Sequence, residues 1–264
     1  MNEPSIGVFD SGVGGLSVLR EMRSRLPRAS FRYVADSAHA PYGERSDGHV
    51  IERTLRIAYE LRAQGATLLV VACNTATAVA IDALRATWPD MPIVGIEPGI
   101  KPALALTRNG RIGVMATRAT LASERFATLL RTQCGQSTVH VHLQACDGLA
   151  AAIESGDLDS AAVRSAVEQH CSALRAHDVD TVVLGCTHYP FAAHHIRASM
   201  GASVVLVDTG AAVAREVERR WQGDAISGAT LSLQTTGDAS ALQDTARDWL
   251  GADQTRITST LHLD

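Results

Sequence analysis

The sequence has few aromatic residues, a single lysine and no paired cysteine motif, and each scarcity excludes a class of protein. Aromatic residues make up 4% of the 264 residues, so a core has to be built from Ala, Val, Leu and Ile. The one lysine, Lys101, lies in a turn-like segment, which disfavours a pyridoxal phosphate enzyme because that cofactor needs a lysine for its Schiff base. The five cysteines are irregularly spaced and none forms a Cys-x-x-Cys pair. We therefore expect free thiols in a reducing compartment, without a disulfide framework or a metal site.

Long apolar runs and a strong net charge are also absent. No apolar run approaches the roughly 20 residues that span a membrane, and the first ten residues lack the basic and apolar regions of a signal peptide. The net charge of −4 gives no electrostatic reason to expect nucleic acid or an anionic membrane as a partner. Hydrophobic residues at 46% and charged residues at 20% are ordinary for a folded globular chain. These features predict a cytoplasmic protein with no nucleic-acid or membrane partner.

Short β-branched runs alternate with longer Ala-, Leu- and Arg-rich segments along the chain, which is typical of βα units and a parallel sheet. Runs such as Val182-Val183-Leu184 are apolar without alternation, as strands covered on both faces should be. The pattern predicts strands at 5–9, 31–35, 67–72, 92–96, 111–115, 138–143, 180–184 and 203–207. It predicts helices at 14–26, 46–64, 75–87, 99–108, 118–132, 157–176, 190–199 and 209–221, and a polar tail from 224 with a helix near 238–250.

Three segments of the first half recur in the second half, in the same order and at nearly the same spacing. The segments that begin at Ile6, Leu68 and Val94 resemble those that begin at Ile112, Val182 and Val205. Short βα units also resemble one another by chance, but three matches in register favour a duplication. We therefore predict two pseudo-symmetric α/β domains with open parallel sheets, facing each other across a cleft. Residues 1–97 and 208–264 would form the first domain, and 98–207 the second.

Each predicted domain carries one cysteine, Cys73 or Cys186, at the end of its third strand. Ligands of open α/β sheets bind outside the carboxyl ends of the strands, so two facing domains would place these thiols on opposite walls of one cleft. A cysteine at a strand end is more often a small buried hydrophobe. The polar residues that follow, Asn74-Thr75 and Thr187-His188, favour a reactive thiol, because a helix start can hold a carboxylate and stabilise a thiolate. The remaining three, Cys134, Cys146 and Cys171, need no role beyond packing.

Two opposed thiols fit the chemistry of racemisation. Inverting a carbon centre requires a base that removes its proton on one face and an acid that returns a proton on the other. A thiol with an ordinary pKa of about 8.5 lies close enough to neutrality to exchange these two roles with its partner. A matched pair of one residue type also suits a reaction whose equilibrium constant is near unity.

Four segments resemble those of bacterial glutamate racemases, in the family's order from residue 6 to about 210. They are 6–16 (IGVFDSGVGGL), 36–43 (DSAHAPYG), 72–77 (ACNTAT) and 184–190 (LGCTHYP). The Cys-Asn-Thr and Gly-Cys-Thr motifs belong to the wider aspartate/glutamate racemase group, whereas Pro-Tyr-Gly and Cys-Thr-His-Tyr-Pro point to the glutamate branch. The resemblance implies a cofactor-independent, two-base interconversion of L- and D-glutamate that supplies D-glutamate for peptidoglycan synthesis in the cell wall.

The resemblance also assigns roles residue by residue. Cys73 would take the proton from the D isomer and Cys186 from the L isomer, with Asp10 supporting the first thiol and His188 and an acidic residue the second. The spacing points to Glu154 as that acidic residue, although the proline-containing stretch that usually precedes it in the family is missing here. The substrate would be held by Asp10, Ser11, Pro41, Tyr42, Gly43, Asn74, Thr75, Thr117, Thr120, Thr187 and His188.

Several alternatives remain open at this point. Gly12-Val13-Gly14-Gly15 could cradle an anion or simply form a tight turn. A dinucleotide fingerprint would need Gly where Ser17 stands, although Asp36 mimics its acidic ribose partner. Asp10 could be a helix N-cap, Tyr42 could serve packing alone, and His194-His195 carry no functional expectation.

Two rival functions also remain. One is a racemase of the same group acting on aspartate or another acidic amino acid, and the other is a nucleotide- or small-molecule-binding module with structural cysteines. The histidine after Cys186-Thr187 favours glutamate over aspartate. We expect a homodimer, as is common for the family and for soluble enzymes generally.

Overall fold

The computed structural model describes residues 4–135, 137–223, 229–251 and 256–263. The chain divides into two compact units: unit 1 comprises Met1–Ile96 and Gly210–Asp264, and unit 2 comprises Glu97–Thr209. The chain therefore passes between the units twice, after Ile96 and after Thr209. None of the helices in the described ranges combines the length and the hydropathy that crossing a bilayer requires.

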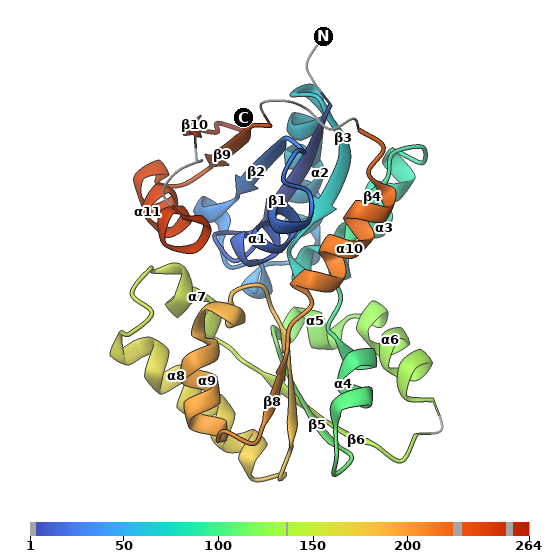
Figure 1. The fold of residues 1–264 in the computed structure, drawn as a ribbon, viewed down its shortest axis with the longest axis vertical. Helices are drawn as coiled ribbons and strands as arrows, with labels where there is room; N and C mark the ends of the chain where they lie inside the picture. The colour runs from blue at the N-terminus through green and yellow to red at the C-terminus, as the bar shows by residue number, and fades with distance from the viewer. Residues whose placement is uncertain (1–3, 136, 224–228, 252–255, 264) are drawn as a thin grey trace. The chain divides into compact units, whose positions relative to one another are not determined.

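Unit 1 is built on a six-stranded parallel sheet with the order β10-β9-β2-β1-β3-β4. The strands in chain order are β1 (Ser5–Asp10), β2 (Phe31–Ala35), β3 (Ala66–Val71), β4 (Ile93–Gly95), β9 (Leu231–Thr235) and β10 (Arg256–Thr260). The sheet joins distant parts of the chain, because β9 pairs with β2. Figure 1 shows this as red strands lying beside blue ones.

Helices cover this sheet in two layers. Helix α1 (Leu16–Arg25) contacts α10 (Gly210–Arg220) and α11 (Ala239–Leu250), whereas α2 (Asp47–Ala63) contacts α3 (Asn74–Thr87) and strands β1 and β3. Two short 3-10 helices, η1 (Ser37–His39) and η2 (Tyr42–Glu44), follow β2. The central strands β1 and β3 are almost wholly buried between the layers, as their continuous apolar sequence requires.

Unit 2 is a smaller version of the same arrangement, with a four-stranded parallel sheet in the order β6-β5-β7-β8. Its strands are β5 (Arg111–Ala116), β6 (His140–Ala145), β7 (Thr181–Gly185) and β8 (Val205–Val207). Helix α4 (Ile100–Leu106) packs with α6 (Glu124–Cys134), which follows the short α5 (Arg118–Ala122). Helix α8 (Ala161–Arg175) packs with α7 (Leu149–Glu154) and with α9 (Ala193–Met200), which continues the 3-10 helix η3 (Tyr189–Ala192).

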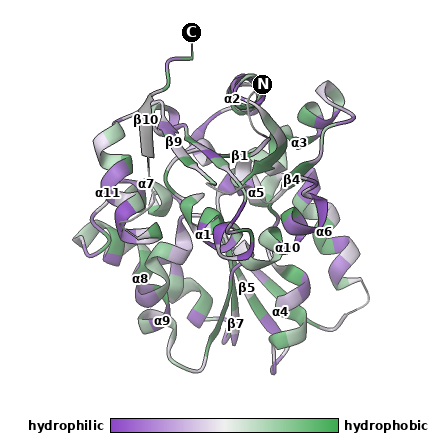
Figure 2. Ribbon diagram, turned by 45° about the horizontal axis from the view of Figure 1, so that its top comes forward, coloured by the Kyte–Doolittle hydropathy of each residue, from purple (hydrophilic) through white to green (hydrophobic). Residues whose placement is uncertain are grey.

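The two sheets share one strand order. The order β2-β1-β3-β4 of unit 1 corresponds strand for strand to β6-β5-β7-β8 of unit 2. The three pairs of similar segments fall on β1 and β5, on β3 and β7, and on β4 and β8. The predicted fold class, two α/β parts with parallel sheets, is confirmed. Figure 2 shows hydrophobic and hydrophilic residues mixed along the helices, as expected for amphipathic helices that pack one face on a sheet.

Several predicted elements differ in detail. The helix expected at 118–132 is two helices, because Ser123 accepts a hydrogen bond from the Phe126 N–H and so starts a new helix at Glu124. The helix expected from 157 begins at Ala161 after the N-cap Ser160. The helix expected from 190 starts as the 3-10 helix η3. Strands β9 and β10 were not expected, whereas the helix predicted near 238–250 is α11.

Candidate active site

The candidate residues of unit 1 lie where the strand order reverses, at the carboxyl ends of β1 and β3. These neighbouring strands pair in parallel, with Phe9 opposite Val71, and the Ala72 N–H donates to the Phe9 carbonyl at 2.8 Å. The residues at the end of β1, Asp10 and Ser11, therefore lie beside those that follow β3, Cys73, Asn74 and Thr75. We call these five residues the Cys73 cluster. Such a switch point is the usual ligand site of an open α/β sheet.

The Cys73 thiol is placed at the start of a helix. Cys73 is the N-cap of α3, and its Sγ accepts a hydrogen bond from the Ala76 N–H at 3.4 Å. The same sulfur lies 3.7 Å from the Ser11 Oγ, and the residue is buried. A helix N-terminus and a donated N–H both favour a negative charge on sulfur. The local structure thus supports a thiolate at Cys73.

Asp10 and the glycine loop that follows it are tightly packed. Asp10 is fully buried and accepts a hydrogen bond from the Ser11 hydroxyl at 3.2 Å. It is not the N-cap of α1, because Gly15 holds that position. A Cβ on Gly15 would lie 2.7 Å from the Asp10 Cβ and 2.9 Å from the Tyr33 hydroxyl oxygen. The absent side chain at Gly15 therefore leaves room for the Asp10 side chain.

Asn74 brings an unused donor to the Cys73 cluster. Its side chain is 4% exposed, and its Nδ2 is one of the buried polar atoms without a hydrogen-bond partner within the described part of the chain. Buried amide groups are nearly always hydrogen-bonded, so an exception calls for an explanation. A ligand with acceptor oxygens beside Cys73 would satisfy this group.

The segment that carries Tyr42 is anchored by Asp36, at the end of β2. Asp36 is fully buried and accepts four hydrogen bonds: two from Arg53 at 2.8 and 3.0 Å, one from the Tyr42 hydroxyl at 2.6 Å and one from the Thr236 hydroxyl at 2.8 Å. Burial alone would raise the pKa of Asp36, but these hydrogen bonds, with Arg53 foremost, outweigh it and lower the pKa. The Asp36 carboxylate already accepts hydrogen bonds from three protein side chains. This disfavours dinucleotide binding, in which Asp36 would have to accept hydrogen bonds from the ribose hydroxyls.

The anchoring also limits what Tyr42 can do. Its hydroxyl is committed to Asp36, and burial together with that carboxylate raises the pKa of the phenol. Pro41, Tyr42 and Gly43 form a turn that begins with a cis Ala40–Pro41 peptide bond and enters η2. Any contact of this segment with a ligand therefore comes from its backbone or ring, not from the hydroxyl.

In unit 2, Cys186 follows β7 and belongs to a chain of three side chains. Its Sγ lies 3.8 Å from the Nδ1 of His188, and the Nε2 of His188 lies 2.6 Å from the Oε2 of Glu154, the last residue of α7. Burial by itself would lower the pKa of His188, but its hydrogen bonds to Cys186 and Glu154 outweigh this and raise the pKa well above the ordinary value. The pairing favours an imidazolium between a carboxylate and a sulfur. We call these residues, with Thr187, the Cys186 cluster.

The two clusters differ in the groups that lie beside the sulfur. Cys73 has a helix start, whereas Cys186 is followed by a bend and the 3-10 helix η3 and has a histidine instead. The expectation that Thr187-His188 opens a regular helix was wrong, since α9 begins only at Ala193. The thiol that follows the third strand of each unit therefore lies at a helix N-terminus in unit 1 and beside a hydrogen-bonded histidine in unit 2.

Thr117 and Thr120 follow β5, which is the strand next to β7. Thr117 is the N-cap of α5, where its Oγ1 accepts from the Thr120 N–H at 3.2 Å and donates to the Thr120 hydroxyl at 2.9 Å. Thr120 and Thr187 are both buried. Thr117 and Thr187 follow the carboxyl ends of the two central strands of unit 2, at the positions that correspond to Ser11 and Asn74 in unit 1.

The other nucleophiles of the chain do not share these features. No cysteine in the described residues forms a disulfide. Burial is the first cause that raises the pKa of Cys134, Cys146 and Cys171, which keeps these thiols protonated. Lys101 is exposed on α4, without the enclosure that a Schiff-base lysine has.

The Asp36–Arg53 pair, which supports the Tyr42 segment, was not predicted from the sequence. One signal was available, because Arg53 lies on the same face of α2 as Val50 and Ile57, at helical spacing, and all three are buried. A charged residue on an apolar helix face indicates a buried partner. The identity of that partner depends on the fold.

Comparison with known proteins gives consistent results. The family model described as Asp/Glu/Hydantoin racemase matches residues 6–217. A glutamate racemase from Pseudomonas paraeruginosa is 52% identical over 214 residues, which cover 81% of this chain and 80% of that protein. The crystal structure of Escherichia coli glutamate racemase in complex with L-glutamate and an activator has a TM-score of 0.86 at 32% identity and covers 98% of both chains. A Bacillus anthracis glutamate racemase has a TM-score of 0.85 at 33% identity, again over 98% of both chains.

Proposed function

The chain belongs to the Asp/Glu/hydantoin racemase family and acts as a glutamate racemase, and from that premise we propose that it interconverts L- and D-glutamate without a cofactor, using Cys73 and Cys186 as the two bases. The observation that carries this proposal is the equivalence of the two thiols. Each follows the same strand of two sheets with one strand order, and each has a group that stabilises negative sulfur. Residues with a purely structural role need no such support.

The proposed reaction with D-glutamate begins at Cys73. Its thiolate removes the α-proton, the electron pair of the Cα–H bond stays on the substrate as a carbanion, and the Cys186 thiol gives its proton to the opposite face of Cα. The reverse direction starts from the Cys186 thiolate and L-glutamate. One proton is taken and one is given in each direction, so the enzyme ends with its thiol and thiolate exchanged.

Each thiol has its own supporting groups in this scheme. The N–H of Ala76 and the start of α3 stabilise the Cys73 thiolate, and Asp10 supports it from the end of β1. The protonated His188, held by Glu154, stabilises the Cys186 thiolate. We propose Glu154 as the acidic partner on the basis of its 2.6 Å contact with His188.

The substrate carboxylates and amine would be bound by the polar groups that surround both thiols. The buried and unpartnered Nδ2 of Asn74 supports carboxylate binding within the Cys73 cluster. The corresponding groups of the Cys186 cluster would come from the threonine hydroxyls and backbone N–H groups near His188. The proposed binding residues are Asp10, Ser11, Pro41, Tyr42, Gly43, Asn74, Thr75, Thr117, Thr120, Thr187 and His188.

The remaining parts of the proposal concern the setting of the reaction. Racemisation by this scheme requires the two thiols to reach opposite faces of Cα. We further propose that the enzyme is a cytoplasmic homodimer and supplies D-glutamate for peptidoglycan synthesis. The net charge of −4 supports the absence of a nucleic-acid partner.

The two-base scheme is tested by following deuterium at Cα in heavy water without added cofactor. Starting from either enantiomer, deuterium should enter the product before it enters the remaining substrate, because the incoming proton comes from the opposite thiol. Cys73→Ser and Cys186→Ser should each lower turnover by at least about a hundredfold. Cys134→Ser is the matched control and should keep full activity. Early deuterium in the remaining substrate, or full activity of either active-site variant, would contradict the proposal.

The rival substrate is tested in the same assay. L-aspartate is one methylene shorter, so its side-chain carboxylate cannot reach the same donors when its α-carboxylate is in place. We expect exchange at Cα of glutamate to exceed that of aspartate. Equal or faster exchange of aspartate would reassign the substrate while leaving the two-thiol scheme intact.

A further inference from the structure

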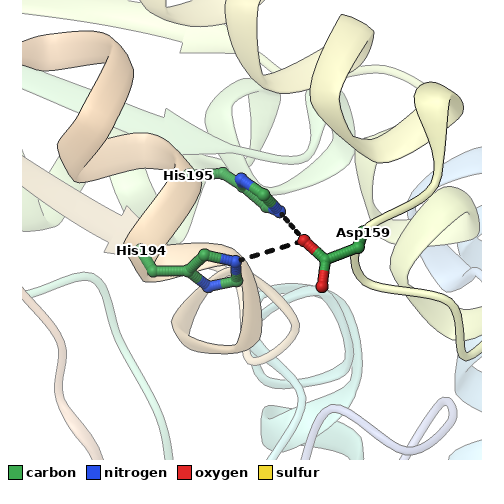
Figure 3. Close-up of side chains that lie close together, drawn as sticks. All are labelled: Asp159, His194 and His195. Atoms are coloured by element: carbon green, nitrogen blue, oxygen red, sulfur yellow. Dashed lines mark ion pairs between the residues drawn. The ribbon is translucent and has the colours of Figure 1, made fainter.

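Three metal-ligating side chains of unit 2 converge outside the Cys186 cluster. The Nε2 of His195 lies 3.1 Å and the Nε2 of His194 lies 3.9 Å from the same carboxylate oxygen, Oδ1 of Asp159 (Figure 3). The three candidate ligand atoms all lie within 4.8 Å of one another. This cluster is not part of the racemisation machinery proposed above.

The convergence is unusual for consecutive helical residues. His194 and His195 are in the first turn of α9, and neighbouring residues on a helix point about 100° apart because a turn takes 3.6 residues. Both imidazoles nevertheless turn toward Asp159, in the segment between α7 and α8, and their ring centroids are 3.8 Å apart. The Nε2 of His195 also lies 3.0 Å from the carbonyl oxygen of Leu158, so this hydrogen bond has to open when Nε2 gives its lone pair to a metal ion.

The spacing of the donor atoms fits a tetrahedral metal ion. Zinc bonds of about 2.0–2.2 Å to nitrogen and oxygen put neighbouring ligand atoms roughly 3.3 Å apart in a tetrahedron. The observed separations of 3.1 and 3.9 Å lie on either side of that value. Two imidazoles and one carboxylate also make a common ligand set for zinc-class ions, with a fourth position left for water. We propose that Asp159, His194 and His195 bind a divalent transition-metal ion of the Zn²⁺ class.

One cation competes for the same carboxylate. The Nη2 of Arg164 lies 3.4 Å from the Asp159 Oδ1, and its Nε donates to the Asp159 carbonyl at 3.0 Å. The Arg164 side chain is 61% exposed, so its terminal nitrogen can turn into solvent when a metal ion takes the carboxylate. The ion then replaces one exposed ion pair, which is worth little in water.

The site would link two segments that already meet at the Cys186 cluster. Asp159 follows Glu154 in the chain, and His194 and His195 follow His188, so the ion would join the same pair of segments that the Glu154–His188 contact joins. A bound ion would therefore hold Glu154 against His188 more firmly. This consequence rests on the proposed function, whereas metal binding itself does not.

The test is metal binding to the untagged full chain carrying Cys73→Ser and Cys186→Ser, which removes competing thiolates and makes the result independent of racemisation. Added Co²⁺ should give the visible absorption of a tetrahedral site with one ion per chain, and Zn²⁺ should displace it. Asp159→Asn and His194→Ala, both at side chains that are more than half exposed, should each weaken Zn²⁺ binding beyond the roughly 10–100-fold that loss of an outer-shell partner typically costs.

The matched control removes two other neighbouring imidazoles. His142 and His177 stack at 4.1 Å in unit 2, and a chain with both replaced by Ala should bind Zn²⁺ as tightly as its parent. Circular dichroism of each variant verifies that it is folded. Unchanged Zn²⁺ affinity in Asp159→Asn and His194→Ala, or an equal loss in the His142/His177 control, would overturn the proposal.

Discussion

Removing the Arg53 side chain tests the anchor beneath the Tyr42 segment. Arg53 and Asp36 are 8% and 0% exposed, and two hydrogen bonds at 2.8 and 3.0 Å join them. Arg53→Met keeps the bulk of the side chain but leaves a buried carboxylate with two hydroxyl donors and no counter-charge. Breaking a buried ion pair on one side typically costs about 3–5 kcal/mol. We expect the free energy of unfolding of unit 1 to fall by that amount at pH 7, measured by urea denaturation.

The pH dependence makes this prediction specific. In the folded parent the pKa of Asp36 is lowered, so the carboxylate stabilises the fold above its unfolded pKa of about 3.9, and this stabilisation is lost as the pH falls through the folded pKa. In Arg53→Met, burial raises the pKa of Asp36 instead, so the folded variant gains stability as the pH falls. The loss relative to the parent should therefore be larger at pH 7 than at pH 5.

A control lies one turn further along α2. Arg56 pairs with Glu52 at 3.2 Å on the surface, with side chains 43% and 61% exposed, so Arg56→Met should change the free energy of unfolding by at most about 0.5 kcal/mol. The reasoning is refuted if Arg53→Met costs no more than this control. An equal loss at pH 7 and pH 5 would refute the electrostatic part alone.

Three further predictions concern single side chains of the two clusters. Glu154→Gln removes the charge that holds His188 protonated, so deprotonation of L-glutamate should slow more than that of D-glutamate; equal slowing, measured as the initial rate in each direction, would contradict the assignment. Asn74→Ala should raise KM for both enantiomers roughly tenfold or more, because a hydrogen bond to a charged group is worth about 1.5–3 kcal/mol; an unchanged KM would remove Asn74 from substrate binding. Gly15→Ala forces a methyl group against the Asp10 side chain and should cost about 1–3 kcal/mol of unfolding free energy, whereas Gly48→Ala, with nothing within 4 Å, should cost none in the same thermal-unfolding assay.

The eight strands β1 to β8 were all predicted to within about two residues at each end. The central strands β1, β3, β5 and β7 are rich in apolar residues and buried along nearly their whole length. Strand β9 was missed because Ser232 and Gln234 interrupt its apolar residues, and its burial alternates along the strand. Alternation is typical of a strand further from the sheet centre, so the pattern used for central strands does not find it.

The candidate site was predictable only where its chemistry is local in sequence. Cys73 and Cys186 stand out because polar residues follow each of them at a strand end. Contacts between distant segments were harder to predict: the resemblance pointed to Glu154 by spacing, but its 2.6 Å contact with His188 requires the fold of α7. Asp159 meets His194 and His195 only after α8 folds back, which no spacing in the sequence indicates.

The passage of the chain between the units has a consequence for biosynthesis. Unit 2 is a continuous segment of the chain, whereas the sheet of unit 1 is complete only when β9 has paired with β2. During translation, all of unit 2 is therefore synthesised before the last strands of unit 1. We expect unit 2 to reach its native state first during translation. The edge of β2 stays unpaired until the C-terminal segment has been made and β9 can pair with it.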